Sequence, residues 1–96
     1  MPKILIYITS RYKWIFLFYG TDFNENRAHV HVGKYGIDNY CKIWLEPEIS
    51  VEKKGELTEL QVQQIIKIVQ EYKNELITQW NKFKAGKNVK TIIIKK

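Results

Sequence analysis

Polar and hydrophobic residues alternate along the first part of the chain, which is the pattern of β-strands. The segments 3–10 and 12–19 both follow it, and a turn at residues 10–11 would join them into a hairpin in which Tyr7 faces Trp14. One face of this hairpin is aliphatic and carries Ile4, Ile6, Ile8, Ile15 and Leu17. The other face is aromatic and carries Tyr7, Trp14, Phe16 and Phe18. We expect a helix to cover the aliphatic face.

A second hairpin is predicted for residues 28–46, with a turn that pairs His31 with Trp44 and His29 with Glu46. Antiparallel partners share a face of the sheet. One face therefore gathers His29, His31, Tyr40, Lys42, Trp44 and Glu46. The opposite face is apolar and carries Val30, Val32, Cys41, Ile43 and Leu45.

At Thr58 the period of the pattern changes from two to about 3.6, and Gln61 completes a capping box there. One hydrophobic stripe then runs as far as Gly86 and consists of Val62, Ile65, Ile66, Val69, Tyr72, Leu76, Trp80 and Phe83. A single helix over this stretch, roughly 26 residues, would span ~39 Å and overhang a small sheet. Residues 89–94 look like a further strand that could cover the overhang.

These elements predict an α+β fold. We expect an antiparallel sheet of four or five strands, the fifth at residues 49–54, with one long C-terminal amphipathic helix packed on one face. An extra C-terminal strand is an option. The length of 96 residues indicates a single domain over residues 1–86. Residues 87–96 would be a lysine-rich segment, either a tail or the added strand.

The net charge of +6 arises at the C-terminal end, because no acidic residue follows Glu75. The lysines beyond it are Lys82, Lys84, Lys87, Lys90, Lys95 and Lys96. A basic end of this kind attracts RNA or an acidic protein through its positive field. The alternative interpretation is a solvated tail that aids solubility.

The single cysteine, Cys41, cannot form a disulfide within the chain, so we expect a reducing compartment, the cytoplasm. The longest apolar run, residues 14–19, is far shorter than the ~20 residues of a membrane helix. The N-terminus also lacks the cleavage site of a signal peptide. We therefore expect no membrane partner.

His29, His31 and Glu46 are the sharpest candidates for chemistry, because histidines two residues apart on a strand project from the same face. Two imidazoles and a carboxylate can ligate a divalent metal, and an open fourth position would allow hydrolysis. The histidines could instead pack against Trp44 as part of the structure, or recognise a macromolecule. A catalytic role for these three residues stays a hypothesis.

No other cofactor motif is visible, so a divalent metal is the one cofactor that the sequence suggests. Asp22 and Glu25 in the loop before the second hairpin are further candidate ligands, although acidic residues in loops are usually just solvated. Whether the protein is an enzyme stays open.

An aromatic sheet face beside a basic segment is typical of surfaces that stack nucleobases and contact phosphates. The candidate binding residues are Trp14, His29, His31, Lys42, Trp44, Lys82, Lys84, Lys87 and Lys90. Burial of the aromatic side chains, under the C-terminal segment or inside a homo-oligomer, is the alternative.

Four segments together resemble the short bacterial proteins of the domain of unknown function 4160 family. They are Met1-Pro2-Lys3-Ile4, Ala28-His29-Val30-His31-Val32, Ile43-Trp44-Leu45-Glu46-Pro47, and Leu76 with Trp80-Asn81. Members commonly have a proline where Ala28 stands here. Genes of this family often lie beside another small gene and are suspected of forming toxin–antitoxin pairs, so the resemblance implies such a pairing for this chain.

The leading expectation is thus a small cytoplasmic bacterial interaction module of toxin–antitoxin type that binds a protein partner, with RNA as a further ligand. The alternative is a small metal- or histidine-dependent nuclease that uses His29, His31 and Glu46.

Overall fold

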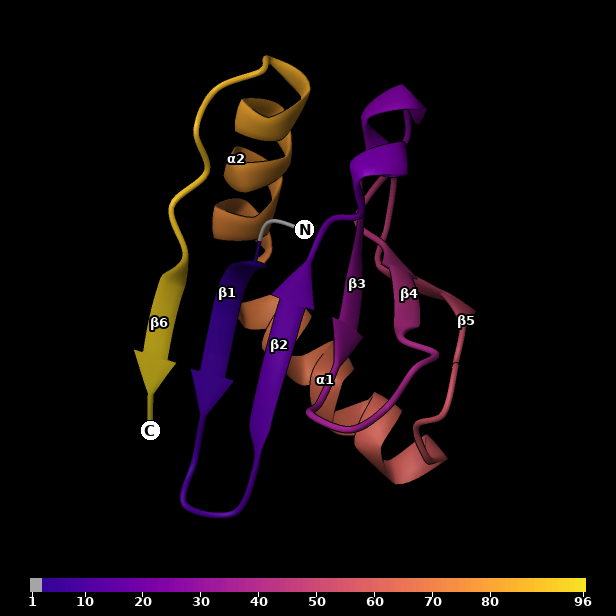
Figure 1. The fold of residues 1–96 in the computed structure, drawn as a ribbon. Coiled ribbons are helices and arrows are strands. Elements are labelled where there is room, and N and C mark those ends of the chain that lie inside the picture. The colour runs from indigo at the N-terminus through magenta and orange to yellow at the C-terminus, as the bar shows by residue number, and fades with distance from the viewer. Residues whose placement is uncertain (1–2) are drawn as a thin grey trace.

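The computed structural model describes residues 3–96, which fold into one six-stranded sheet with two α-helices (Figure 1). The strands are β1 (Lys3–Ile8), β2 (Lys13–Leu17), β3 (His29–Gly33), β4 (Cys41–Trp44), β5 (Ser50–Lys53) and β6 (Ile92–Lys95). The helices are the 3-10 helix η1 (Gly20–Asn24) and the α-helices α1 (Glu59–Glu71) and α2 (Lys73–Lys84). The predicted α+β class is confirmed.

The strand order in the sheet is β5-β4-β3-β2-β1-β6. Strands β1 to β5 pair antiparallel, whereas β6 runs parallel to β1. The chain crosses from one edge of the sheet to the other between β5 and β6, and α1 and α2 make this crossing on one side of the sheet (Figure 1). The five predicted antiparallel strands are present, and so is the optional C-terminal strand. Because that strand pairs in parallel with β1, the sheet is mixed and six-stranded, which the prediction of a four- or five-stranded antiparallel sheet described only in part.

The single long helix predicted from Thr58 onward is also wrong, since the helical stretch is divided at Tyr72. Tyr72 leaves the helical conformation, with φ −109° and ψ 23°, and so separates α1 from α2. The predicted capping box is confirmed: Thr58 Oγ1 accepts from the Gln61 backbone N–H at 3.1 Å, and Gln61 Oε1 accepts from the Thr58 N–H at 2.9 Å. A straight helix of this length would extend past the edge of the sheet. The bend at Tyr72 instead keeps Leu76 of α2 in the core.

The helices cover the aromatic face of the sheet, not the aliphatic one. The predicted pairing of Tyr7 with Trp14 is confirmed, but β2 pairs with β3 so that Phe16 lies opposite Val32. The aromatic side chains therefore share the apolar side of β3, and Phe18 packs edge-on against Trp80 of α2 at 5.2 Å. The aromatic side chains therefore lie on the face opposite to His29 and His31, because Leu17, and not Phe16, is the β2 residue that pairs with His31.

The second hairpin has its register shifted by two residues from the prediction. His29 pairs with Trp44, and His31 pairs with Lys42. A shift of two keeps every side chain on its predicted face, since side chains alternate with a period of two. It does, however, move Glu46 past the end of β4 and away from His29.

The core lies between the sheet and the two α-helices. Its fully or almost fully buried members include Trp14, Phe16, Phe18, Val30, Val32, Ile43, Leu45, Ile65, Val69, Leu76 and Trp80. Among the helices of residues 3–96, none has the length and apolar composition needed to cross a lipid bilayer.

Replacing Ile65 with aspartate should unfold the protein, because Ile65 has no solvent exposure and an unpaired buried charge costs several kcal/mol. The matched control is Leu60→Asp on the same helix, where the side chain is 67% exposed. Thermal unfolding followed by circular dichroism measures both. Equal melting temperatures for the two variants would mean that α1 buries a different face.

Gln79 ties α2 to both β1 and the segment before β6. Its Nε2 donates hydrogen bonds to the carbonyl oxygens of Ile4, at 3.1 Å, and Lys90, at 2.6 Å. Gln79→Leu should lower the free energy of unfolding by ~2–3 kcal/mol, because both carbonyls lose this donor. Urea denaturation measures the loss, with the exposed Gln63→Leu as control. A loss no larger than that of the control would show that the amide is dispensable.

Candidate functional site

Two histidines and one aspartate meet at the end of β3 that lies under η1. Strand β3 places His29 and His31 on the same face, and η1 brings Asp22 against them. Asp22 Oδ1 lies 3.1 Å from His29 Nε2, and Asp22 Oδ2 lies 3.0 Å from His31 Nε2. We call these three residues the Asp-His-His cluster.

The short helix η1 fixes the position of the aspartate. The Asp22 carboxylate accepts a hydrogen bond from the Tyr19 backbone N–H at 2.8 Å, which caps the first turn of η1. Because this hydrogen bond ties the Asp22 side chain to the backbone at the start of its own helix, the carboxylate has little freedom to turn away from β3.

The His29 ring is oriented by the backbone that precedes β3. Its Nδ1 lies 2.9 Å from the carbonyl oxygen of Arg27, so Nδ1 carries a hydrogen and donates it. In the neutral ring, Nε2 then presents a lone pair towards Asp22. Although the distances to the carboxylate are short, neither His29 Nε2 nor either ring nitrogen of His31 has a well-aligned hydrogen bond.

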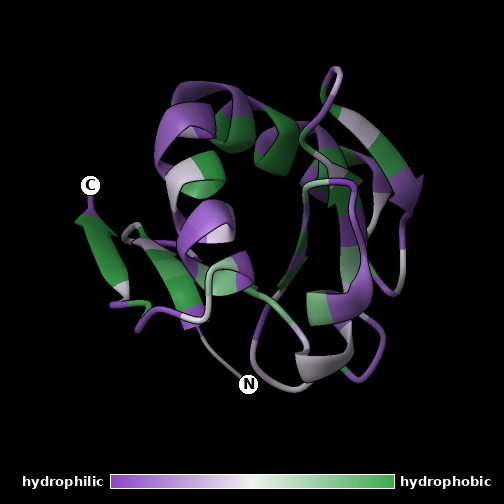
Figure 2. Ribbon diagram, turned by 90° about the horizontal axis from the view of Figure 1, so that it is seen from above, coloured by the Kyte–Doolittle hydropathy of each residue, from purple (hydrophilic) through white to green (hydrophobic). Residues whose placement is uncertain are grey.

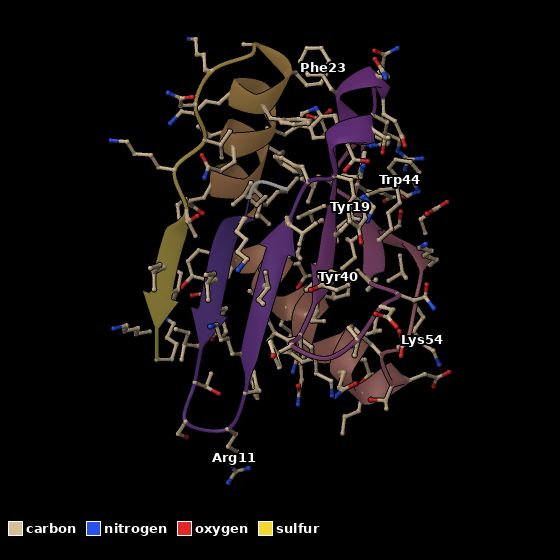
Figure 3. The ribbon with its side chains drawn as sticks, viewed as in Figure 1. Arg11, Tyr19, Phe23, Tyr40, Trp44 and Lys54 are labelled. Carbon is tan, nitrogen blue, oxygen red and sulfur yellow. The ribbon has the colours of Figure 1, made fainter. Side chains whose placement is uncertain are left out.

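The cluster is enclosed by protein. His29 is 0% exposed, Asp22 3% and His31 5%. Aromatic rings wall it in: the ring centroid of Trp80 lies 4.9 Å and that of Trp44 5.5 Å from His29. Tyr19 lies over His31, with ring centroids 4.2 Å apart, and Figure 3 shows Tyr19 and Trp44 on the same part of the molecule, near η1.

Burial and the neighbouring groups shift the protonation of the cluster. Burial alone would raise the pKa of Asp22, but the hydrogen bond from Tyr19 and the nearby histidines outweigh it, so this pKa lies below its ordinary value. Burial holds the pKa of His31 below its ordinary value, although the Asp22 carboxylate acts in the opposite direction. At neutral pH, Asp22 is therefore ionised and His31 is neutral.

The sequence predicted Glu46 as the carboxylate beside the two histidines, and this prediction is wrong. Glu46 is exposed, and it is its backbone carbonyl oxygen that accepts a hydrogen bond from Arg27 Nε at 2.6 Å. Asp22 takes the predicted place of Glu46, although a loop acid was expected to be solvated. The sequence does hint that Asp22 has a structural role, because its spacing of three residues from Tyr19 is that of a helix-capping pair. Only the folded loop shows that the carboxylate points towards the histidines.

Lys42 and Lys84, two of the predicted binding lysines, are engaged within the protein. Lys42 Nζ lies 3.3 Å from Glu25 Oε1 and 4.5 Å from the centroid of the Trp44 ring. Lys84 Nζ donates to the backbone carbonyl oxygens of Phe23 and Glu25, which fastens η1 to α2.

The remaining predicted binding residues divide into buried and exposed ones. Trp14 is 1% exposed and belongs to the core. Lys82, Lys87 and Lys90 are exposed, and Lys82 and Lys90 line a groove of about 500 Å³ between α2 and the segment before β6. The lysines of the C-terminal region are therefore not gathered at the histidines.

The fold and the cluster define a class of small α+β proteins in which a bent helical pair covers one face of a sheet and a buried Asp-His-His group lies near the other. The family model for a domain of unknown function (DUF4160) matches residues 14–81. The chain belongs to this family, and the matched segment contains all three residues of the cluster. No curated protein and no solved structure matched in the two other comparisons.

Asp22→Asn should lower the free energy of unfolding by ~2–3 kcal/mol at pH 7, because a neutral amide replaces the ionised carboxylate that accepts a charge-assisted hydrogen bond from the Tyr19 N–H. The pKa of Asp22 is lowered by folding, so the stability from its ionised form is present above its ordinary pKa of about 3.9 and is lost as the pH falls through the folded-state pKa. The two proteins should therefore converge in acid.

Urea denaturation at pH 7 and at pH 3 measures this convergence, with the exposed Glu46→Gln as the control that should match the parent at neutral pH. A gap between Asp22→Asn and the parent that is equally wide at both pH values would contradict an ionised Asp22.

Proposed function

We propose that the protein is a small cytoplasmic interaction module, one member of a toxin–antitoxin-type pair, and that it binds a protein partner through the uncovered face of its sheet. The observation that carries this proposal is an aliphatic surface on β6 and β1, on the side opposite α1 and α2, formed by Ile93, Ile6 and Ile8. Family membership supports the paired role, because genes of such proteins often lie beside another small gene. Cys41, buried and without a disulfide, suits the reducing cytoplasm.

The pairing of the strands assembles the uncovered face. Ile6 lies between Ile15 of β2 and Ile93 of β6, and all three point away from the helices. Ile93 is 57% exposed. Figure 2 shows β6, which ends at the C mark, coloured as hydrophobic and lying outside the helices. Ile15 itself is buried, whereas Ile6 and Ile8 are partly exposed. We call Ile6, Ile8 and Ile93, with the lysines next to them, the open face.

Charge gives the open face its preference for a partner. Ile8 is flanked by Lys13 on β2 and by Lys95 on β6, and both lysines are exposed. An aliphatic centre with lysines at one end is complementary to a protein surface that has apolar side chains next to Asp or Glu. The net charge of +6 favours association with an acidic partner in the same way.

The burial of the histidines favours binding over cleavage. A nuclease must bring a phosphodiester to its catalytic groups, and the Asp-His-His cluster is almost completely enclosed. Glu46, the carboxylate of the nuclease hypothesis, is exposed, and it is Asp22 that lies with the histidines. RNA cleavage that is lost in His31→Gln would nevertheless restore the nuclease as the better explanation.

The test is to purify the chain together with the product of the neighbouring gene and to measure their dissociation constant. Ile93→Glu should weaken the complex by about tenfold or more, because an exposed apolar contact is replaced by a charge of the same sign as the partner's. Leu60→Glu, which alters a side chain on α1 that is at least as exposed, should leave the affinity unchanged.

Three results would contradict the proposal. Equal affinities of Ile93→Glu and the parent would remove the open face from the interface. A dimer of the chain alone that Ile93→Glu dissociates, measured by light scattering, would assign the face to a second copy. Salt-sensitive RNA binding without any protein partner would make the lysines, not the isoleucines, the functional surface.

A further inference from the structure

We infer that Asp22, His29 and His31 form a binding site for one divalent transition-metal ion such as Zn²⁺. This inference concerns the sheet face over β3, which β1 and β2 separate from Ile93 of β6, and it does not depend on a protein partner. It rests on the placement of three ligand atoms, the orientation of the histidines and the surroundings of the cluster.

The three residues can each offer one ligand atom to a common point. One ring nitrogen of His29, one of His31 and a carboxylate oxygen of Asp22 all lie within 4.8 Å of one another. In a tetrahedral zinc site the ligand atoms lie ~2.1 Å from the metal and hence ~3.4 Å apart. The distances of 3.1 Å from His29 Nε2 to Asp22 Oδ1 and of 3.0 Å from His31 Nε2 to Asp22 Oδ2 are close to that spacing, so each imidazole already lies at ligand distance from the carboxylate.

The orientation of His29 is the one that metal-binding histidines adopt. Its Nδ1 donates to the Arg27 carbonyl oxygen, which leaves the Nε2 lone pair free for a cation. A hydrogen bond from one ring nitrogen to a backbone carbonyl is the usual outer-shell support of a histidine ligand.

The competing explanation for the close approach of the three side chains is that they hydrogen-bond to one another. This explanation leaves ring nitrogens of both histidines without hydrogen-bond partners. To donate to Asp22 as well as to Arg27, His29 would need a hydrogen on both ring nitrogens and would be a buried cation. The Nε2 atoms of both histidines nevertheless lack an aligned hydrogen bond, and His31 Nδ1 lacks one too. Buried polar atoms are rarely left in this state, so a ligand at this point accounts for the arrangement better.

The donor set and its surroundings indicate the metal and its role. Two imidazoles with one carboxylate favour zinc, cobalt, nickel or manganese over magnesium and calcium, which prefer oxygen ligands. The rings of Tyr19, Trp44 and Trp80 enclose the cluster, so the ion would be reached by little besides water. The site would thus fasten η1 to β3, as a structural metal does, rather than act on a substrate.

The test uses the full chain without an affinity tag, because His29 and His31 are then its only histidines. After treatment with a chelator, the protein is titrated with Zn²⁺ alone in a calorimeter, and Mg²⁺ serves as the control ion. We expect one zinc ion per chain and a higher melting temperature with zinc, and neither effect with magnesium.

Three variants test the ligand assignment, with circular dichroism reporting whether each is folded. Asp22→Asn and His31→Gln should each weaken zinc binding by about tenfold or more, whereas Glu46→Gln should bind as the parent does. Zinc affinity that is unchanged in folded His31→Gln, or a parent that binds no zinc at a one-to-one ratio, would overturn the inference.

If the ligand variants do not fold, a spectroscopic measurement on the parent protein tests whether the cluster binds a metal ion. Co²⁺ in a site with two histidines, a carboxylate and a water gives intense visible absorption bands, whereas octahedral aqueous Co²⁺ absorbs weakly. Intense bands that vanish on addition of Zn²⁺ are expected. A spectrum that stays like that of aqueous Co²⁺ would overturn the inference.

Discussion

Strand β3 is buried on both of its faces, and the rest of the structure follows from this constraint. Its valines point to the helix side, where Val30 and Val32 join the core. Its histidines point to the other side, where burial leaves two imidazoles that must be satisfied. Folding of η1 back over the strand brings the Asp22 carboxylate to both rings, but His29 Nε2 and both ring nitrogens of His31 still lack an aligned hydrogen bond within the protein.

The same side of the sheet is consequently divided into a closed half and an open half. Over β3, η1 and the aromatic rings close the face, and Tyr40 packs so tightly on Gly33 that a Cβ atom there would lie 2.7 Å from its ring. Over β1 and β6 nothing comparable is seen in the described residues, and Ile93 remains exposed. The closed half suits an ion or a structural network, and the open half suits a macromolecular partner.

This division also relates the two proposals physically. Lys84 ties η1 to α2, and Gln79 ties α2 to β1 and to the backbone at Lys90, so backbone and side-chain contacts run from the cluster to the edge of the sheet. An ion that fastens η1 would stabilise one end of this chain of contacts. A partner on the open face would hold the other.

The sequence by itself determined the local features: the first hairpin with Tyr7 opposite Trp14, the capping box of Thr58 and Gln61, and the placement of both histidines on one face of a strand. Each depends on residues close together in the chain, and the family could be recognised from short segments such as residues 28–32 and 43–47. The tertiary structure alone decided which sheet face the helices cover, where the helical stretch bends at Tyr72 and which carboxylate meets the histidines. These outcomes depend on how β2 aligns with β3 and on how η1 folds back over the strand. The local hydrophobic period encodes neither the strand register nor the path of the loop. Both are set by how much surface the whole folded chain buries.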